Sequence, residues 1–206
     1  MKPRKPADWI GKTGVIARAL FNQVQNIRAC PRSDSLDRCF LFTGPPGNGK
    51  TTLAEAFAAE LCDDPVFGVE SMNGQSLAVE RVRQWMMTGA YKPLYGGMNV
   101  KLIDEIDGGS VAAFNEMRTY LDRLPPHTVV IATTNKPIKE LQEQLQSRFQ
   151  VWKFDPIPEP ALAVWLAQKF NIAGHVAHDV AKQAAGNVRA ATADAKAYLT
   201  ALKAAA

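Results

Sequence analysis

Short apolar runs and stretches of helical periodicity alternate along the first 155 residues. The runs expected to form buried strands cover residues 39–42, 65–72, 100–103, 128–132 and 151–154. Apolar residues spaced three and four apart predict helices over 15–27, 51–61, 76–88, 110–124 and 138–147. Strands that alternate with helices build a parallel sheet covered on both faces. We therefore predict an α/β domain over residues 1–155, with a five-stranded parallel sheet between helices.

The pattern changes near residues 155–160, where three prolines stop any strand or helix. Beyond this connector the apolar positions keep helical spacing only. They predict helices over 161–170, 176–185 and 187–202. Residues 156–206 are therefore expected to form a small all-α domain that follows the α/β domain.

Charge is distributed unevenly along the chain. The 206 residues carry a net charge of +4, yet residues 1–40 alone hold eight Lys and Arg against three Asp and Glu. A basic arm on a neutral body favours a polyanionic partner such as nucleic acid. A solvated terminal segment explains the same charge equally well, so charge alone does not decide the partner.

Several classes of protein are excluded. The sequence has no uncharged apolar run near the ~20 residues that a membrane span needs, and no apolar leader follows the basic start. Three scattered cysteines are too few for a disulfide framework or a zinc site. We expect a reducing, cytoplasmic compartment and no membrane partner.

One loop carries the strongest chemical signal. It matches G-x-x-x-x-G-K-[ST] and lies between a predicted strand and a predicted helix, as a phosphate-binding P-loop requires. The glycines let backbone N–H groups turn toward phosphate oxygens, and Lys50 is expected to reach the β- and γ-phosphates. The hydroxyl of Thr51 is expected to ligate Mg²⁺. The residues assigned to nucleotide binding here are Gly44, Pro45, Pro46, Gly47, Asn48, Gly49, Lys50, Thr51 and Thr52.

An acidic pair supports this prediction. Asp104 and Glu105 directly follow the apolar run 100–103, so they are expected at the sheet edge where ligands bind. Asp104 can hold Mg²⁺ directly or through water. Glu105 can polarise the attacking water as a general base. The sequence therefore predicts an ATPase that uses ATP and Mg²⁺.

These motifs, in this order, resemble those of the AAA+ ATPases, which are P-loop NTPases with a helical lid. Within that class the chain looks most like the small subunits of replication factor C-type clamp loaders. The resemblance implies that Ile10 and Gly11 contact the adenine, and that Asn135 is sensor 1, beside the γ-phosphate or the water. It further implies that Arg189 is sensor 2, the arginine of the lid.

The resemblance also implies catalysis across a subunit interface. Gln146-Ser147-Arg148-Phe149 is similar to the family's Ser-Arg-Cys box, with Phe149 in place of Cys. In the family this arginine acts on ATP bound to the neighbouring subunit, so Arg148 is expected to be catalytic together with Glu105, Lys50 and Asn135. Asn73 corresponds to the residue that holds the catalytic glutamate away from water.

DNA, duplex or primed, is the expected partner, alongside other AAA+ subunits and a sliding clamp or helicase. In clamp loaders, helices equivalent to 76–88 and 110–124 face the duplex. Here these stretches carry Arg81, Arg83, Arg118 and Arg123. A solvated helical face accounts for the same charges. The sequence lacks the third, collar domain of clamp loaders, which weakens clamp loading as the specific task.

Three alternatives remain open. The first is another DNA-directed AAA+ switch, such as a helicase loader or a transposition or recombination regulator. The second is a protein-remodelling ring, since Tyr91 and Tyr95 offer aromatic residues of the kind found in pore loops. The third is a nucleotide-binding scaffold without turnover, against which the intact Lys50, Asp104 and Glu105 argue.

Overall fold

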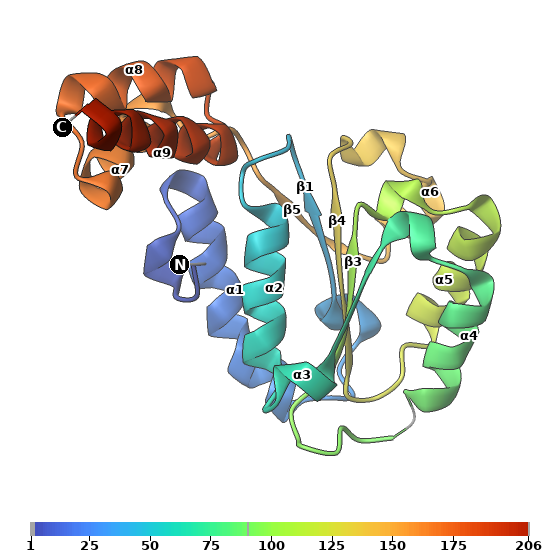
Figure 1. Cartoon of the computed structure of the whole chain (residues 1–206). Helices are drawn as coiled ribbons and strands as arrows, with labels where there is room; N and C mark the ends of the chain where they lie inside the picture. The colour runs from blue at the N-terminus through green and yellow to red at the C-terminus, as the bar shows by residue number, and fades with distance from the viewer. Residues whose placement is uncertain (1–2, 90, 206) are drawn as a thin grey trace.

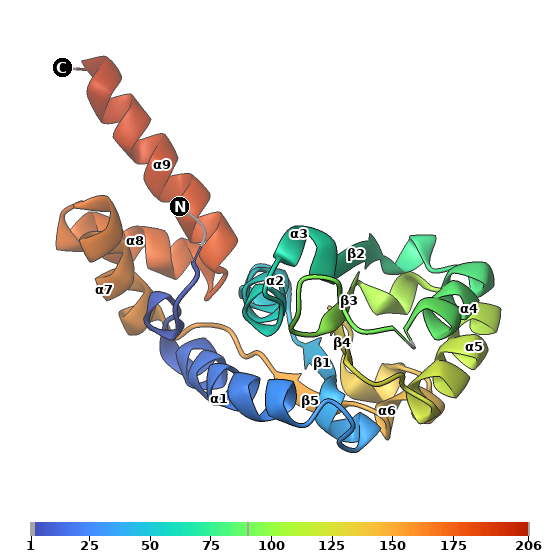
Figure 2. The same cartoon turned by 90° about the horizontal axis from the view of Figure 1, so that it is seen from below.

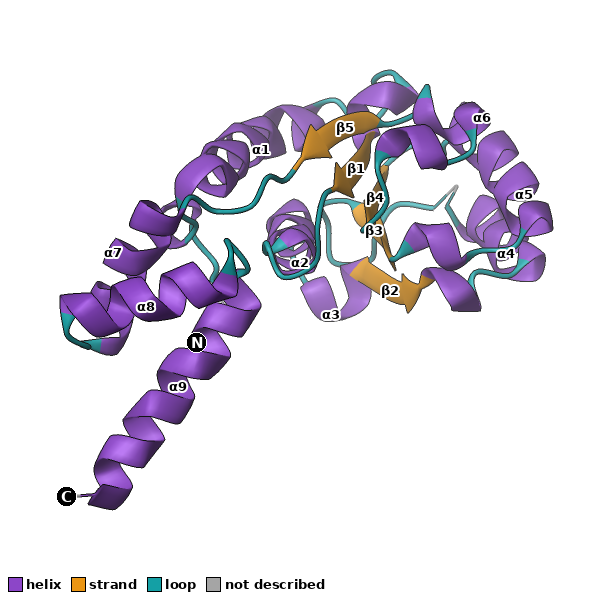
Figure 3. Cartoon of the chain, turned by 90° about the horizontal axis from the view of Figure 1, so that it is seen from above, coloured by secondary structure: helices purple, strands orange, loops and turns teal. Residues whose placement is uncertain are grey.

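A five-stranded, fully parallel sheet forms the centre of the protein, as the alternating pattern predicts. The computed structural model describes residues 3–89 and 91–205. The strands lie in the order β2-β3-β4-β1-β5 (Figures 1 and 3). Their bounds are β1 Cys39–Thr43, β2 Val69–Asn73, β3 Asn99–Asp104, β4 Thr128–Thr134 and β5 Gln150–Lys153.

Helices cover both faces of this sheet, which gives three layers (Figure 1). One face packs against α1 and α2, and the other against α4 and α5. The helices of this part of the chain are α1 Gly11–Ala29, α2 Lys50–Leu61, α3 Pro65–Gly68, α4 Val79–Thr88, α5 Val111–Asp122 and α6 Glu143–Gln146.

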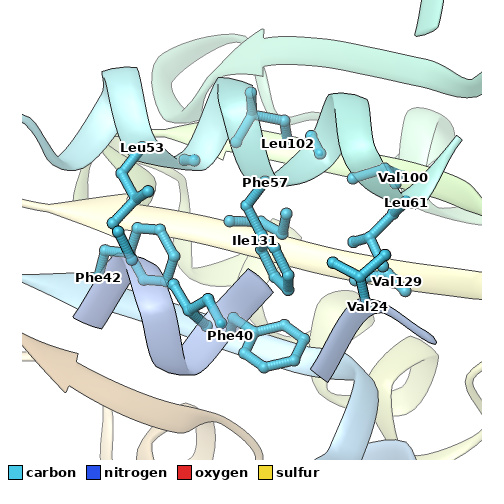
Figure 4. Packing of buried hydrophobic residues seen from close by; sticks show 14 of the residues in the cluster. Val24, Phe40, Phe42, Leu53, Phe57, Leu61, Val100, Leu102, Val129 and Ile131 are labelled. Atoms are coloured by element: carbon cyan, nitrogen blue, oxygen red, sulfur yellow. The ribbon is translucent and has the colours of Figure 1, made fainter. Parts of the chain in front are cut away.

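The central strands are buried on both sides, and this explains their uninterrupted apolar sequence. Alternate residues of β1 point to opposite faces: Phe40 and Phe42 join the α1–α2 side, whereas Cys39 and Leu41 join the α4–α5 side. Figure 4 shows Phe40 and Phe42 with Phe57 of α2 in one apolar cluster. The rings of Phe40 and Phe57 meet edge to face, with centroids 5.1 Å apart.

The structure differs from the prediction in two segments. The run 65–72 is not one strand, because Pro65 begins the short helix α3, capped by the carboxylate of Asp64, which accepts from the Val66 N–H at 2.9 Å. The stretch 138–147 is not one helix either. Leu141 is extended (φ −79°, ψ 156°) between a 3₁₀ turn and α6. This conformation lets its side chain pack in the core beside Leu145.

The C-terminal part of the chain is all-α, as predicted. Helices α7 (Glu159–Phe170), α8 (Gly174–Ala184) and α9 (Val188–Ala205) share an apolar cluster of their own, separate from the two clusters on the sheet. Small side chains such as Ala177, Ala181 and Ala191 are fully buried, which lets the helices approach closely. Helix α9 then projects away from the sheet (Figures 2 and 3).

Candidate functional site

A cavity of about 590 Å³ opens at the carboxyl end of the sheet, between the α/β part and the C-terminal helices. Most residues assigned to the nucleotide from the sequence line it. They are Ile10, Pro46, Gly47, Asn48, Gly49, Lys50, Thr51, Thr52, Asp104, Glu105, Asn135 and Arg189. Gly44 and Pro45 do not line it themselves, but their backbone carbonyls accept hydrogen bonds from Lys50, which does. Gly11 and Arg148 do not line it within the described residues.

Glycines determine the shape of the loop between β1 and α2. Gly47 and Gly49 have φ values of +83° and +86°, in the left-handed region that other residues rarely adopt. A Cβ at Gly47 would lie 1.9 Å from Oδ1 of Asn187, at the start of the C-terminal helix α9. The Arg189 N–H also donates to the Gly47 carbonyl at 3.3 Å. The loop is therefore tightly curled and is in contact with the C-terminal helices.

Lys50 begins α2 and is buried, with 5% of its surface exposed. Its Nζ donates to the carbonyls of Gly44 and Pro45, at 2.7 and 2.8 Å, and to Oδ1 of Asn135 at 2.8 Å. All three acceptors are neutral oxygens. Burial lowers the pKa of Lys50 to about 8. A buried ammonium without a directly bonded anion is a site that an anionic ligand would stabilise.

The carboxylate of Asp104 accepts two hydroxyl hydrogen bonds at the end of β3. Thr51 Oγ1 donates to Asp104 Oδ1 at 2.7 Å, and Thr133 Oγ1 of β4 donates to the same oxygen. Thr51 lies in α2 and Asp104 ends β3, and both residues line the cavity. Their side-chain oxygens therefore lie together at one side of it. Thr133 is a site residue that sequence reasoning did not assign, although it lies only two positions before Asn135.

Glu105 has a left-handed backbone (φ 52°, ψ 53°), which costs an ordinary residue about 1–2 kcal/mol. Its N–H donates to Thr133 Oγ1 at 3.1 Å, and its Oε1 accepts from Nδ2 of Asn135 at 3.2 Å. Asn135 thereby bridges Lys50 and Glu105 with the two ends of one amide. Strain of this kind is typical of functional positions, where the surrounding contacts hold it.

Asn73 does not hold Glu105 in this structure, contrary to the role that the resemblance implies. The Oδ1 of Asn73 accepts from the Gln75 N–H at 2.9 Å and so caps the turn after β2. The contact to Glu105 comes from Asn135 instead.

The N-terminal segment and the C-terminal helices close the cavity from the side. Trp9 is 8% exposed and packs beside the phosphate loop near Gly49. Trp165 packs against the apolar cluster of the C-terminal helices and also lines the cavity, with Lys169 Nζ 4.4 Å above its ring. Lys196 also lines the cavity, seven positions after Arg189 on α9. The sequence offered only this helical spacing as a signal for Lys196.

Arg148 lies on the α5 side of the molecule and forms an ion pair within its own chain. Its Nε and Nη2 donate to the two carboxylate oxygens of Asp122, at 2.6 and 2.9 Å. The hydrogen bonds from Arg148 lower the pKa of Asp122 below its usual range. The neighbouring Phe149, which departs from the family's box, is buried against the α4–α5 side of the sheet.

The arginines predicted to face DNA lie on and after two adjacent helices, α4 and α5. Arg81 pairs with Glu70 at 3.4 Å, and Arg83 pairs with Glu116 at 3.1 Å. The two tyrosines considered as pore-loop residues lie in the segment before β3, at the amino end of the sheet and away from the cavity. There the ring of Tyr95 packs on Phe67 of α3, with centroids 4.8 Å apart.

The residues present fit a magnesium nucleotide. The cavity volume is within the ~300–1,000 Å³ of small-molecule sites, and a buried Lys50 lies in its floor. Mg²⁺ in such sites takes one or two protein oxygens besides phosphate and water, which Thr51 and Asp104 can supply. Across residues 3–89 and 91–205 we find no group of three His, Cys, Asp or Glu side chains able to hold a metal ion unaided. In the same residues no helix combines the length and apolarity that a bilayer crossing demands.

Curated proteins with similar sequences include a subunit of replication factor C and a RuvB subunit. The replication factor C small subunit of Haloarcula marismortui is 28% identical over 131 residues, which cover 60% of this chain and 38% of that protein. The Holliday junction branch migration complex subunit RuvB of Myxococcus xanthus is 31% identical over 170 residues, 73% of this chain and 45% of that protein. The aligned region thus spans less than half of these relatives.

The fold has close counterparts among solved structures. The Thermotoga maritima RuvB Holliday junction branch migration motor superimposes with a TM-score of 0.70 over 98% of this chain and 67% of its own, at 22% identity. At this identity the likeness shows the fold alone. Residues 40–154 match the family described as "ATPase family associated with various cellular activities (AAA)". Since this match covers more than half of the chain, the protein belongs to the AAA family of ATPases.

Proposed function

We propose that the protein binds Mg²⁺-ATP in the cavity at the carboxyl end of the sheet and hydrolyses it to ADP and phosphate. The observation that carries this proposal is the buried Lys50, whose Nζ is held by three neutral oxygens beside the phosphate loop. A triphosphate would replace these weak acceptors with charged ones. Residues 1–155 would then be the ATPase domain and residues 156–206 its lid, with Arg189 reaching toward the γ-phosphate.

Glu105 and Asn135 supply the remaining groups for hydrolysis in this proposal. The Glu105 carboxylate accepts a proton from the attacking water, and its hydrogen bond to Asn135 fixes where it points. Asn135 ties that carboxylate to Lys50, so one amide coordinates the base and the phosphate-binding cation. Mg²⁺, when bound at Thr51 and Asp104, would neutralise developing phosphate charge. Ile10 and Gly11 are assigned to the adenine.

Completion of the pocket by a neighbouring subunit is the second part of the proposal. Arg148 lies outside the cavity of its own chain, on the side of α5, where a second AAA subunit could present its ATP. An arginine supplied in trans contributes roughly 10³–10⁵ in rate in well-studied NTPases. Hydrolysis would then require assembly into an oligomer.

Mixing two inactive variants tests this arrangement. Lys50→Ala subunits cannot bind ATP but keep the arginine, whereas Arg148→Ala subunits bind ATP but lack it. Separately, both should be inactive; mixed, they should regain part of the wild-type ATPase rate. A mixture as inactive as its components would refute catalysis in trans.

We further propose DNA as the partner, with clamp loading as the favoured task. Curated relatives carry the names replication factor C small subunit, RuvB and DNA polymerase III subunit tau/gamma. The arginines of α4 and α5 would contact the phosphate backbone, which tracks duplex shape and not sequence. A sliding clamp or a helicase would then be the protein partner. The three free cysteines fit a reducing, cytoplasmic compartment.

A second DNA-directed function, branch migration or a related switch, is supported by the RuvB relative that is 31% identical over 170 residues. Protein remodelling has less support, because Tyr91 and Tyr95 follow α4 and lie at the amino end of the sheet, away from the cavity.

The ATPase rate with and without primed duplex DNA, at two salt concentrations, tests the DNA proposal. Stimulation that falls steeply with added salt is expected, because phosphate contacts release counterions. Stimulation by an unfolded protein and none by DNA would refute it. Adding a purified clamp or a forked DNA separates the two DNA-directed tasks.

A further inference from the structure

The last residue of α5, Asp122, has a carboxylate where a helix disfavours one. The C-terminal end of a helix carries partial negative charge, so acidic side chains there are unfavourable unless a cation compensates them. Arg148 provides that compensation from 26 positions away in the sequence. The pairing therefore requires the tertiary fold and is not a local helical contact.

The geometry of this pair fixes the plane of the guanidinium. Nε and Nη2 of Arg148 each donate to a different oxygen of Asp122, at 2.6 and 2.9 Å, and Nη1 donates to Ser147 Oγ at 3.4 Å. A two-point contact between planar groups restricts rotation far more than a single hydrogen bond does. The arginine is thus oriented before any neighbouring subunit arrives.

The pair remains accessible to a partner. The side chain of Arg148 keeps 26% of its surface exposed and that of Asp122 keeps 48%. Exposed ion pairs contribute little to folding stability, so this one is not needed to hold the sheet together. A long side chain that is already oriented loses less freedom when it engages a ligand.

We infer that Asp122 is a positioning residue for catalysis across the subunit interface: it holds Arg148 oriented for ATP bound to the adjacent protomer. This inference rests on the proposed role of Arg148 in trans. Asp122 itself touches no substrate and acts only through the arginine. Its effect should therefore be confined to the subunit that donates the arginine.

The first test compares Asp122→Asn with the wild-type protein in ATPase assays. We expect kcat to fall roughly 10- to 100-fold, as misplaced catalytic groups do, with KM for ATP within twofold. Asp122→Glu, which keeps the charge, should recover part of the rate. Asp63→Asn is the matched control, because it removes a carboxylate that pairs with Arg28 far from the cavity, and it should leave kcat unchanged.

The second test places the substitution in one subunit type of the mixed assembly. In a mixture of Lys50→Ala and Arg148→Ala subunits, the arginine of the first acts on ATP bound to the second. Adding Asp122→Asn to the Lys50→Ala subunit should remove the restored rate. Adding it to the Arg148→Ala subunit should change nothing.

The outcomes separate the two proposals. If the parent mixture regains no activity, catalysis in trans fails and the role of Asp122 falls with it. If the mixture regains activity, three results would each overturn the positioning role and leave catalysis in trans intact. The first is an unchanged kcat in Asp122→Asn, and the second is a raised kcat, which would mean that Asp122 masks the arginine. The third is an equal loss of the restored rate whichever subunit carries the substitution.

Discussion

Two buried cations lie at the opposite ends of strand β1, and their surroundings differ in one respect. Arg38, directly before the strand, is 4% exposed and donates to the carbonyls of Ser33, Pro125 and Thr128 at 2.8–3.0 Å. Lys50, after the strand, is 5% exposed and is also held by carbonyls. Lys50, however, lines a cavity of about 590 Å³, whereas Arg38 does not line it.

The comparison shows that a buried cation hydrogen-bonded to backbone carbonyls does not by itself indicate a functional site. Arg38 joins the carbonyls of two loop residues to that of Thr128, the first residue of β4, and so supplies buried carbonyls at the amino end with a donor. Lys50 makes equally short bonds next to a space that a ligand can enter. Substitutions at the amino end should thus change stability, and those at the carboxyl end should change binding and turnover.

The largest effect is expected for Lys50→Ala. Removing the cation should weaken ATP binding by at least roughly 1,000-fold, because phosphate charge would lose its buried partner. Calorimetric titration measures the affinity, and thermal unfolding should show a retained fold. Lys182→Ala, at an exposed position of α8, is the control. Binding at wild-type strength would contradict the assignment of the cavity to the triphosphate.

Glu105→Gln separates turnover from binding at the same end. The amide cannot accept a proton, so the ATPase rate should fall roughly 10²–10⁴-fold while ATP affinity stays within a few-fold. Single-turnover assays measure the chemical step directly. An unchanged rate would remove Glu105 from the chemistry. Glu140→Gln, at an exposed position 35 residues further along the chain, should behave as wild type.

Arg38→Met should lower the stability of the protein and leave ATP binding unchanged. It removes the side-chain hydrogen bonds to three carbonyls, so the free energy of unfolding should fall by about 2–3 kcal/mol. Urea denaturation measures this loss, and ATP affinity should be unchanged in the folded protein. Arg32→Met, on the exposed side of the same segment, should cost less than about 0.5 kcal/mol. A loss of ATP affinity in Arg38→Met would contradict the assignment of Arg38 to stability alone.

Thiol labelling measures the smallest of the expected effects, at the level of single cysteine side chains. Burial raises the pKa of Cys39 to about 12 and that of Cys62 to about 11, whereas Cys30 is exposed. At pH 8 the thiolate fraction of Cys62 would be about one in a thousand, so only Cys30 should react quickly. Faster labelling of Cys39 in Arg38→Met would show that the amino end opens. Three fast thiols in the wild-type protein would contradict the burial.

The sheet was predictable because strands buried on both faces leave uninterrupted apolar runs. The two errors have different causes, the first in local sequence and the second in tertiary packing. The segment 65–72 is as apolar as a strand, yet its first half forms a helix once Pro65 and the Asp64 cap set the backbone. Leu141 interrupts a helical pattern because an extended backbone brings its side chain into the core.

The site was predictable residue by residue but not contact by contact. Lys50, Thr51, Asp104, Glu105 and Asn135 follow from motif and strand position, and the structure gathers them at one cavity. The sequence could not indicate that Asn135 bridges Lys50 and Glu105, which lie 85 and 30 positions before it in the chain. Nor did it indicate Asp122, since nothing local marks one carboxylate at a helix end as the partner of a distant arginine.

The contact between Gly47 and the start of α9 has a mechanical consequence. Helix α9 has 18 residues, which at about 1.5 Å per residue makes it roughly 27 Å long. Because its first turn contacts the loop between β1 and α2, a tilt of about 10° there would move its far end through about 5 Å. In the proposed function, a sub-ångström adjustment of that loop on phosphate release would thus be magnified into a displacement large enough to reach a neighbouring molecule.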